Sequence, residues 1–140
     1  MKKNSRKLYG YQTTNRAKHN LKIHLILVCK YRKKLLMNGI ETDVKNIIKD
    51  IENNSDFDII EMETDKDHIH LMIQYIPRIS VSAIVNRIKS ATTKRIWNLH
   101  QDYLQKHFWR EKTFWTDGYF VCSVGEASPE TIQNYIKNQG

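Results

Sequence analysis

Residues 67–73 read Asp-His-Ile-His-Leu-Met-Ile, and this stretch decides how the chain folds. Side chains of a β-strand alternate between its two faces, so His68 and His70 project together from one face. The isoleucines and the leucine that alternate with them project from the other. A strand with one apolar face packs that face on a core. The sequence therefore predicts a strand that buries its aliphatic residues and turns both histidines away from the core.

Two more strands and one helix come before the histidine strand. The apolar segment 22–31, KIHLILVCKY, is typical of a buried central strand. Residues 57–64 predict a second strand, and the turn Asp65-Lys66-Asp67 joins it to the histidine strand. Between the first two strands, Thr42 can cap a helix whose apolar residues repeat at helical spacing until a turn cluster at 53–55.

A second helix, a fourth strand and a final helix follow. Ser80 or Ser82 can cap a helix with apolar side chains along one side, and residues 97–109 suit either its continuation or a loop. Residues 115–124 predict a strand. Ser128-Pro129-Glu130 is a strong helix start, because a capping serine, a proline at the first position and an acid in the first turn coincide.

The predicted order is βαββαβ with an added C-terminal helix that carries Tyr135. This is the α+β, ferredoxin-like or RRM-like arrangement, an antiparallel sheet with its two helices on one face. The first and third strands are central in that topology. His68 and His70 are therefore expected in the middle of the sheet, on the surface that the helices leave open.

Size, charge and cysteine content restrict the class of protein. With 140 residues the chain forms a single domain, 1–140, and residues 1–20 predict a basic N-terminal arm with little structure of its own. Lys and Arg number 23 against 15 acidic residues, and this net charge of +8 suits a polyanionic partner and a merely basic protein about equally. Two cysteines, no apolar leader and no long apolar run predict a cytoplasmic protein without disulfides or a membrane span.

Tyr135 and Gln139 are the candidates for chemistry near the C-terminus. Residues four apart lie on one side of a helix, so a phenol and an amide oxygen project together. Brought to the two imidazoles, they would form a divalent-metal site beside a tyrosine nucleophile, which suits the cutting of a phosphodiester. Each part also has a simpler interpretation, since a His-x-His pair is more often structural, Tyr135 can be an apolar anchor and Gln139 can be solvated.

Basic and aromatic side chains are the candidates for contact with nucleic acid. As a set, the cations after the first strand and on the second helix favour DNA contact, although each alone suits a solvated face. The predicted DNA-binding residues are Arg32, Lys33, Lys34, Arg87, Lys89, Lys94 and Arg95. Four aromatic residues can either stack on unpaired bases or pack in the core: Trp97, Trp109, Phe114 and Trp115.

The combination of motifs resembles the single-tyrosine HUH transposases, the small TnpA-type enzymes that move insertion sequences as single-stranded DNA. The resemblance extends from about Asn20 to Gln139. Its parts are the histidine pair on a strand, the basic run Lys30-Tyr31-Arg32-Lys33-Lys34, the segment Gly118-Tyr119-Phe120-Val121, and Tyr135 with Gln139 on a C-terminal helix. Their order and spacing make the resemblance more specific than any one of them.

The resemblance implies a function, a cofactor and partners. It implies a divalent metal, Mg²⁺ or Mn²⁺, held by His68, His70 and Gln139, with Tyr135 as the nucleophile. The implied substrates are single-stranded DNA hairpins at the element ends, where cleavage leaves a 5′-phosphotyrosine and a free 3′-hydroxyl that later rejoins the DNA. The implied assembly is a homodimer in which the tyrosine helix of one subunit can complete the histidine site of the other.

Two alternatives remain open. An RRM-like protein without catalytic activity would use the open sheet face to bind single-stranded RNA or DNA, but it would carry aromatic residues where this chain has His68, His70 and Met72. An HUH nuclease retained by a host would keep the cutting activity without a mobile element, and the sequence barely separates it from a transposase.

Overall fold

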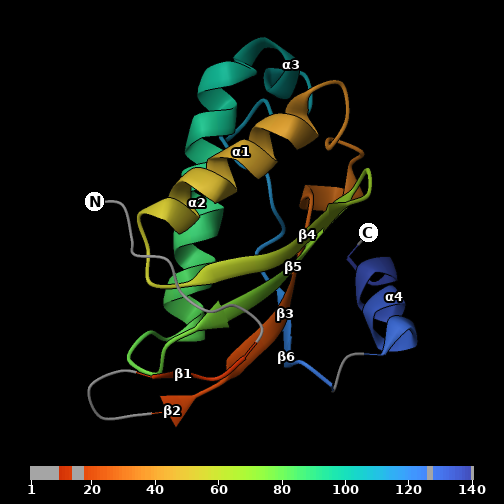
Figure 1. Cartoon of the computed structure of the whole chain (residues 1–140). Coiled ribbons are helices and arrows are strands. Elements are labelled where there is room, and N and C mark those ends of the chain that lie inside the picture. Colours follow the sequence, from red (N-terminus) through yellow and green to blue (C-terminus); the bar gives the residue numbers. More distant parts are fainter. Residues whose placement is uncertain (1–9, 14–17, 126–127, 140) are drawn as a thin grey trace.

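The computed structural model describes residues 10–13, 18–125 and 128–139 of the chain. A four-stranded antiparallel sheet lies at its centre, with helices α1 (Ile40–Asn53) and α2 (Val81–Leu99) on one side. Helix α4 (Pro129–Lys137) lies on the opposite side (Figure 1). The predicted α+β arrangement, with an added C-terminal helix, is confirmed.

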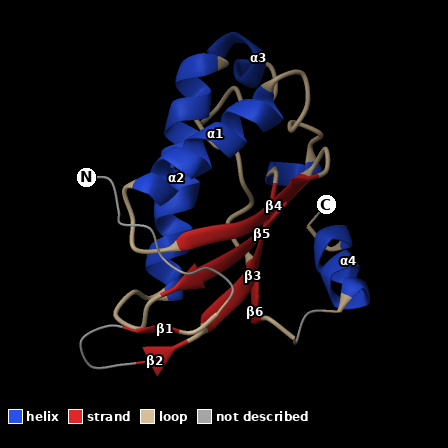
Figure 2. Ribbon diagram, in the orientation of Figure 1, coloured by secondary structure: helices blue, strands red, loops and turns tan. Residues whose placement is uncertain are grey.

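The strands run in the order β4-β5-β3-β6, so that β3 and β5 are central (Figure 2). Their bounds are Leu21–Val28 for β3, Asp58–Thr64 for β4, His68–Tyr75 for β5 and Phe120–Ser123 for β6. Each strand pairs antiparallel with its neighbours. The predicted positions of the first and third strands, and hence of the histidines, are confirmed.

Alternation along β3 and β5 divides the sheet into two faces. One face carries Leu25, Leu27, Leu71 and other aliphatic residues into the large core beneath α1 and α2. The opposite face carries Ile26 and Val28, which pack on α4. Both histidines of β5 belong to that second face, because His68 pairs with Val28 and His70 with Ile26.

The helix starts follow the predicted chemistry in two places out of three. The Ser80 hydroxyl accepts a hydrogen bond from the Ala83 amide at the start of α2, and Ser128 caps α4 in the same way. The expectation of a Thr42 cap is wrong, because α1 already begins at Ile40. Gly39 occupies the preceding position with φ of 93°, a left-handed conformation that glycine adopts without strain.

Several segments are more irregular than the sequence predicts. Residues 97–109 divide between the end of α2, a short helix α3 (Gln101–Gln105) and a loop. The last strand is shorter than expected, since a single bridge between Cys29 and Trp115 is followed by a break before β6. Part of the predicted N-terminal arm forms an antiparallel pair, β1 (Gln12–Thr13) with β2 (Lys18–His19).

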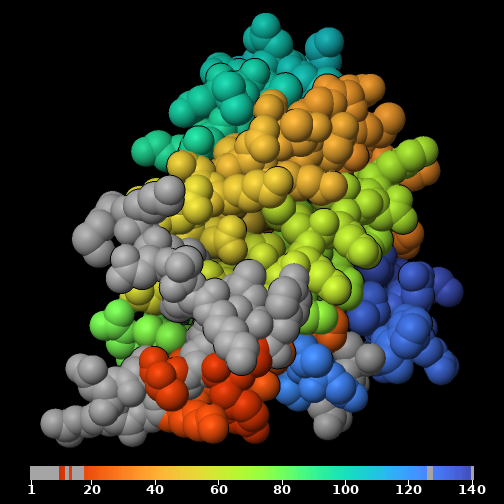
Figure 3. Space-filling view, viewed as in Figure 1, coloured from red at the N-terminus to blue at the C-terminus, as the bar shows by residue number. Residues whose placement is uncertain are grey.

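In the space-filling view, the atoms of α4 lie at the margin of the molecule, beside the layer formed by the sheet (Figure 3).

Within the described residues, no helix has the length and apolar character that crossing a membrane would require.

Candidate active site

Three histidines lie together on the face of the sheet that α4 occupies. His24 of β3 approaches His70 of β5, with 2.8 Å between Nδ1 of His24 and Nε2 of His70. Burial is the main cause that lowers the pKa of His70, and the neighbouring His24 lowers it further. His70 therefore stays neutral, and a neutral imidazole is the form that binds a metal. The contact between His24 and His70 depends on the register between β3 and β5.

The third imidazole, His68, is held by the residue before it. One oxygen of Asp67 lies 2.8 Å from His68 Nδ1, and the other lies 3.5 Å from Nε of Arg32. A carboxylate at Nδ1 fixes the orientation of the ring and leaves Nε2 for another ligand, as is common in metal sites. Arg32 also donates to the carbonyl oxygen of Lys137 at 3.3 Å, so the same arginine reaches the C-terminal end of α4.

Helix α4 places Tyr135 over the end of β6. Its apolar side packs Ile136 against Ile26 and Val28, and the Tyr135 ring lies 5.5 Å from the Phe120 ring. The Tyr135 hydroxyl is shielded from solvent and makes no hydrogen bond of standard geometry within the described residues. Burial raises the pKa of Tyr135, and the neighbouring Thr116 side chain offsets part of that rise.

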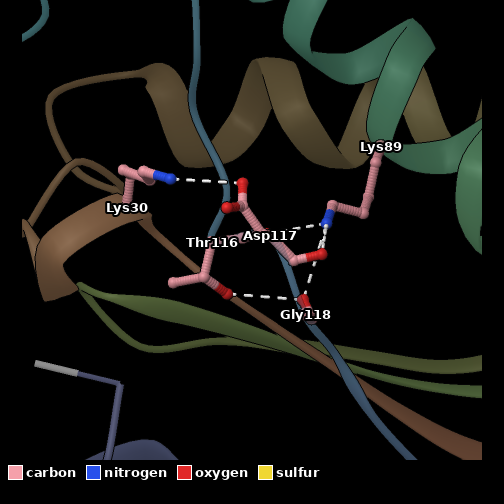
Figure 4. A network of polar contacts seen from close by, with 5 residues as sticks. All are labelled: Lys30, Lys89, Thr116, Asp117 and Gly118. Carbon is pink, nitrogen blue, oxygen red and sulfur yellow. Dashed lines mark hydrogen bonds and ion pairs between the residues drawn. The ribbon is translucent and has the colours of Figure 1, made fainter.

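A turn at residues 116–118 is contacted by two lysines, Lys30 at the Asp117 carboxylate and Lys89 at the backbone carbonyls (Figure 4). The Tyr135 hydroxyl lies beside this turn. A Cβ on Gly118 would lie 3.9 Å from the Tyr135 hydroxyl oxygen, an ordinary van der Waals distance, so the hydroxyl lies directly beside residue 118. Lys89 of α2 donates to the carbonyl oxygens of residues 116, 117 and 118 at 2.7, 3.0 and 3.5 Å. Lys30 pairs with the Asp117 carboxylate at 3.2 Å. Burial lowers the pKa of Lys89, while Asp117 offsets part of that shift.

The turn and the histidines lie on one row across the sheet. The Thr116 amide donates to the Val28 carbonyl at 2.8 Å, and Val28 pairs with His68 on the other side. Neighbouring strands lie about 4.8 Å apart, so roughly 10 Å of sheet separates Thr116 from His68. Between them, Ile136 packs on the apolar side chains of Ile26 and Val28. One face thus combines imidazoles, a shielded phenol and the end of a helix.

The sequence family follows from comparison with known proteins. The family described as transposase IS200-like matches residues 17–139. The chain belongs to the IS200-like transposases. The predicted resemblance is thereby confirmed, and with it DNA transposition as the process in which this protein takes part.

Individual relatives agree with this membership. The transposase is 29% identical over 121 residues to the ISDra2 transposase TnpA of Deinococcus radiodurans, covering 86% of this chain and 85% of the relative. It is 30% identical over 120 residues to the transposase for insertion sequence element IS200 of Salmonella typhimurium, covering 86% and 77%.

Solved structures share the fold. A crystal structure of a Deinococcus radiodurans R1 protein, assigned as a transposase, has a TM-score of 0.84 and 26% identity, covering 91% of this chain and 97% of that one. A tyrosine transposase bound to a REP hairpin has a TM-score of 0.55 and 12% identity, covering 89% and 68%, and shows likeness of fold alone.

Gln139, the predicted third ligand, lies just beyond the helix of the transposase. Helix α4 ends at Lys137, so the expectation that Gln139 sits on the helix is wrong. Its amide donates to the Ile136 carbonyl at 3.1 Å in the turn that follows, and its side chain is half-buried. Among the described residues, no three His, Cys, Asp or Glu side chains converge as a metal site would require. A metal bound by His68 and His70 would take its further ligands from groups such as the Gln139 amide oxygen or His24.

The predicted DNA-binding cations fall into two groups. Three of the four on α2 already have partners within the fold: Lys89 at the 116–118 turn, Arg87 on the Asn54 carbonyl at 3.0 Å, and Arg95 on the Asp50 carboxylate at 2.7 Å. Lys94 is exposed on α2 and lines an open cavity of about 550 Å³ together with Lys112. The remaining predicted cations, Arg32, Lys33 and Lys34, follow β3 beside the histidine site.

The four aromatic candidates divide clearly. Trp97, Phe114 and Trp115 are buried in the core, while the Trp109 side chain is 75% exposed. The indole nitrogens of the two buried tryptophans donate to the Thr113 carbonyl and to the Thr92 hydroxyl. Core packing thus accounts for three of the four, and Trp109 alone faces solvent.

Proposed function

We propose that this transposase cleaves and rejoins single-stranded DNA at hairpin-marked insertion-sequence ends through a 5′-phosphotyrosine on Tyr135. The observation that carries the proposal is the Tyr135 hydroxyl, which is shielded from solvent beside the Thr116 side chain and lies on the same side of the sheet as His68 and His70. This arrangement brings a phenol and two imidazoles to one face, as a tyrosine nucleophile beside a metal site requires.

The proposed reaction is an in-line exchange at phosphorus. The Tyr135 oxygen forms a bond to the phosphorus as the bond from phosphorus to the 3′ oxygen breaks. The phenolic proton leaves, and the 3′ oxygen gains a proton to become a free hydroxyl. Reversal by a 3′-hydroxyl rejoins DNA and restores the tyrosine. Because one phosphodiester replaces another, no external energy source is needed.

His68 and His70, with Gln139, would hold the divalent metal in this proposal. His68 suits the role because Asp67 engages its Nδ1, and His70 suits it because its pKa is lowered and its ring stays neutral. The contact from His24 to Nε2 of His70 would have to yield, or His24 would become a further donor. When bound, Mg²⁺ or Mn²⁺ would polarise the scissile phosphate and stabilise the charge that develops on it.

Covalent trapping tests the nucleophile. Labelled single-stranded oligonucleotides from the flanks of the gene are incubated with Mn²⁺ or EDTA and separated on a denaturing gel. Wild type should give a metal-dependent protein–DNA band, and Tyr135→Phe should give none while still binding DNA. Tyr75→Phe is the matched control, since Tyr75 is also partly buried but packs against the core beneath α1 and α2. A band that persists in Tyr135→Phe would refute the assignment.

Binding of Mn²⁺ tests the metal ligands without relying on activity. Titration calorimetry should detect Mn²⁺ binding to the wild type, and His68→Ala and His70→Ala should each weaken it by at least about tenfold. Unchanged Mn²⁺ affinity in both variants would exclude these histidines as ligands. Gln139→Ala tests the third proposed ligand in the same assay.

A homodimer in which α4 serves the partner's site is the remaining part of the proposal. Mixing His68→Ala with Tyr135→Phe distinguishes the arrangements, since each chain alone lacks one half of the site. An adduct on the His68→Ala chain requires its tyrosine to act at the partner's histidines. Absence of an adduct from the mixture would favour action within one chain, as the contact of Arg32 with α4 suggests.

A binding protein of the RRM-like type is the alternative. The centre of the face in question carries His24 and His70, and Ile26 and Val28 are covered by α4. Among the described residues, the central strands of that face carry no open aromatic platform of the kind such proteins use. Tight binding of single strands with no covalent band under any metal condition would favour the alternative.

A further inference from the structure

Two exposed aromatic side chains line one open cavity near the histidine site. Tyr31 is 65% exposed and Trp109 is 75% exposed, and both border a cavity of about 550 Å³. Phe108 forms part of its wall, with its ring centroid 6.5 Å from that of Tyr31. We call this feature the Tyr31–Trp109 cleft. Large rings left in solvent lose the benefit of burial, and clustered ones commonly mark a binding surface.

The backbone that presents Tyr31 is strained. Residues Lys30–Arg32 form a 3₁₀ turn in which Tyr31 has φ of 60° and Arg32 has φ of 53°. L-residues rarely adopt this left-handed conformation, and it persists where the surroundings impose it, often at functional sites. In this turn Tyr31 is left exposed, while Arg32 reaches Asp67, the partner of His68. The cleft and the histidine site thus share consecutive residues.

Cations lie over the rings of the cleft. Lys30 Nζ is 5.6 Å from the centroid of the Tyr31 ring, and the Arg110 guanidinium is 4.7 Å from that of Trp109. Lys33 Nζ lies 5.9 Å from the Phe108 ring. Among the described residues that line the cavity, Glu111 is the acidic one. Flat apolar surfaces surrounded by positive charge are complementary to unpaired nucleotides, whose bases stack and whose phosphates are anionic.

We propose that the Tyr31–Trp109 cleft stacks an unpaired base of the strand whose phosphate lies at the histidine site. The proposal rests on the proposed function and adds a base-binding subsite to it. Base pairs within a duplex keep their faces stacked on one another, so this cleft selects single-stranded DNA. It also favours a nucleotide a short distance from the scissile phosphate, because Tyr31 directly precedes Arg32.

The experiment measures DNA affinity in EDTA, where binding is separated from cleavage. Fluorescence anisotropy with a labelled single-stranded oligonucleotide is compared for wild type, Trp109→Ala and Tyr31→Ala. Each variant should bind about tenfold more weakly, with an unchanged dependence on salt, because stacking releases no counterions. Leu99→Ala is the matched control, since Leu99 is 62% exposed but does not line the cleft. Its affinity should equal that of the wild type.

Abasic substitutions identify the stacked base. Each position of the oligonucleotide in turn is replaced by an abasic site, and one position should weaken binding to wild type by about tenfold. The same substitution should have little effect on Trp109→Ala, because the stacking partner is already absent. Equal sensitivity in both proteins, or equal affinity of both for the intact strand, would overturn the proposal, as would wild-type binding of duplex as tight as that of single strands.

Adduct formation with Mn²⁺ in the same preparations separates this proposal from the function on which it rests. An adduct together with affinity that is independent of Trp109 and Tyr31 refutes the cleft and leaves the function standing. Affinity that depends on Trp109, without any adduct, supports the cleft and refutes the cleavage. A wild-type protein that binds no single strand refutes both. Thermal melting confirms that the variants are folded, as expected for exposed side chains.

Discussion

The two faces of the sheet are built on different principles. The face beneath α1 and α2 packs a large, continuous core in which most aliphatic side chains are fully buried. On the face beneath α4, the buried cluster among the described residues consists of Ile26, Val28 and Ile136, with partly buried side chains of β6 and α4 packed against it. The comparison indicates that one side maintains the fold, while the other side carries the residues of the proposed active site.

Helix α4 depends on this smaller cluster to remain folded. It has nine residues, and isolated helices of that length are not stable in water. Ile136 and the hydrogen bond from Arg32 to the Lys137 carbonyl are its main contacts with the sheet side of the site. Elements with few buried contacts open at low free-energy cost, which would suit the proposed role of α4 as the carrier of the nucleophile.

The largest effect on stability is expected on the face of the sheet beneath α1 and α2. Ile69 of β5 is fully buried there, and Ile69→Ala should lower the free energy of unfolding by about 2–5 kcal/mol through lost burial and a residual cavity. Urea unfolding followed by circular dichroism measures this change. A loss well below 1 kcal/mol would contradict the view that this face holds the fold together.

The matching substitution on the other face should separate activity from stability. Ile136→Ala removes the main apolar contact of α4, so adduct formation should fall about 30-fold as the docked population drops. The global unfolding midpoint should move little, because α4 can leave before the core unfolds. Gln133→Ala, an exposed position on the same helix, is the control. Faster adduct formation in Ile136→Ala would mean that the docked helix is a resting state.

The same contrast explains which parts of the structure the sequence predicts. The faces of β5 followed from strict alternation, and the starts of α2 and α4 followed from Ser80 and Ser128, because these signals are local. The start of α1 was predicted at Thr42, but the helix begins directly after Gly39, where a glycine in a left-handed conformation ends the preceding loop. Local physical chemistry was thus sufficient for β5, α2 and α4, whereas at α1 two local signals competed and Gly39 decided the start.

Contacts between distant segments were not predictable in this way. The pairing of His24 with His70 depends on strand register, and the position of Lys89 behind Tyr135 depends on where the 116–118 turn returns to α2. Charge alone grouped Lys89 with the DNA-binding residues, whereas its ammonium group is surrounded by carbonyl oxygens. Gln139 was expected one helical turn after Tyr135, and the helix ends before it.

Two lysines on α2 sharpen the comparison between the faces. Lys89→Met removes the three hydrogen bonds that Lys89 donates to the carbonyl oxygens of residues 116–118. The turn beside the Tyr135 hydroxyl should shift as a result, and adduct formation should slow about tenfold. DNA affinity and its salt dependence should stay close to wild type. Lys94→Met, one turn along and exposed, should show the reverse pattern, with weaker binding and a smaller salt slope. If both substitutions weaken DNA affinity equally, Lys89 contacts DNA, as predicted from the sequence.

The smallest effect concerns the proton on Tyr135. Burial raises its pKa above the usual value, so the phenol is neutral from pH 7 to 9 and its ionised fraction grows about tenfold per pH unit. If the phenolate attacks, the rate of adduct formation should rise with pH across that range. Thr116 is the side chain that lowers this pKa, so Thr116→Val should slow the reaction about threefold at each pH without changing the slope. Single-turnover adduct formation measured from pH 7 to 9 checks both expectations. A rate independent of pH would mean that a base with a pKa below 7 takes the proton as the bond to phosphorus forms. The shielding of this hydroxyl beneath α4 would then serve packing on the sheet instead of control of the nucleophile.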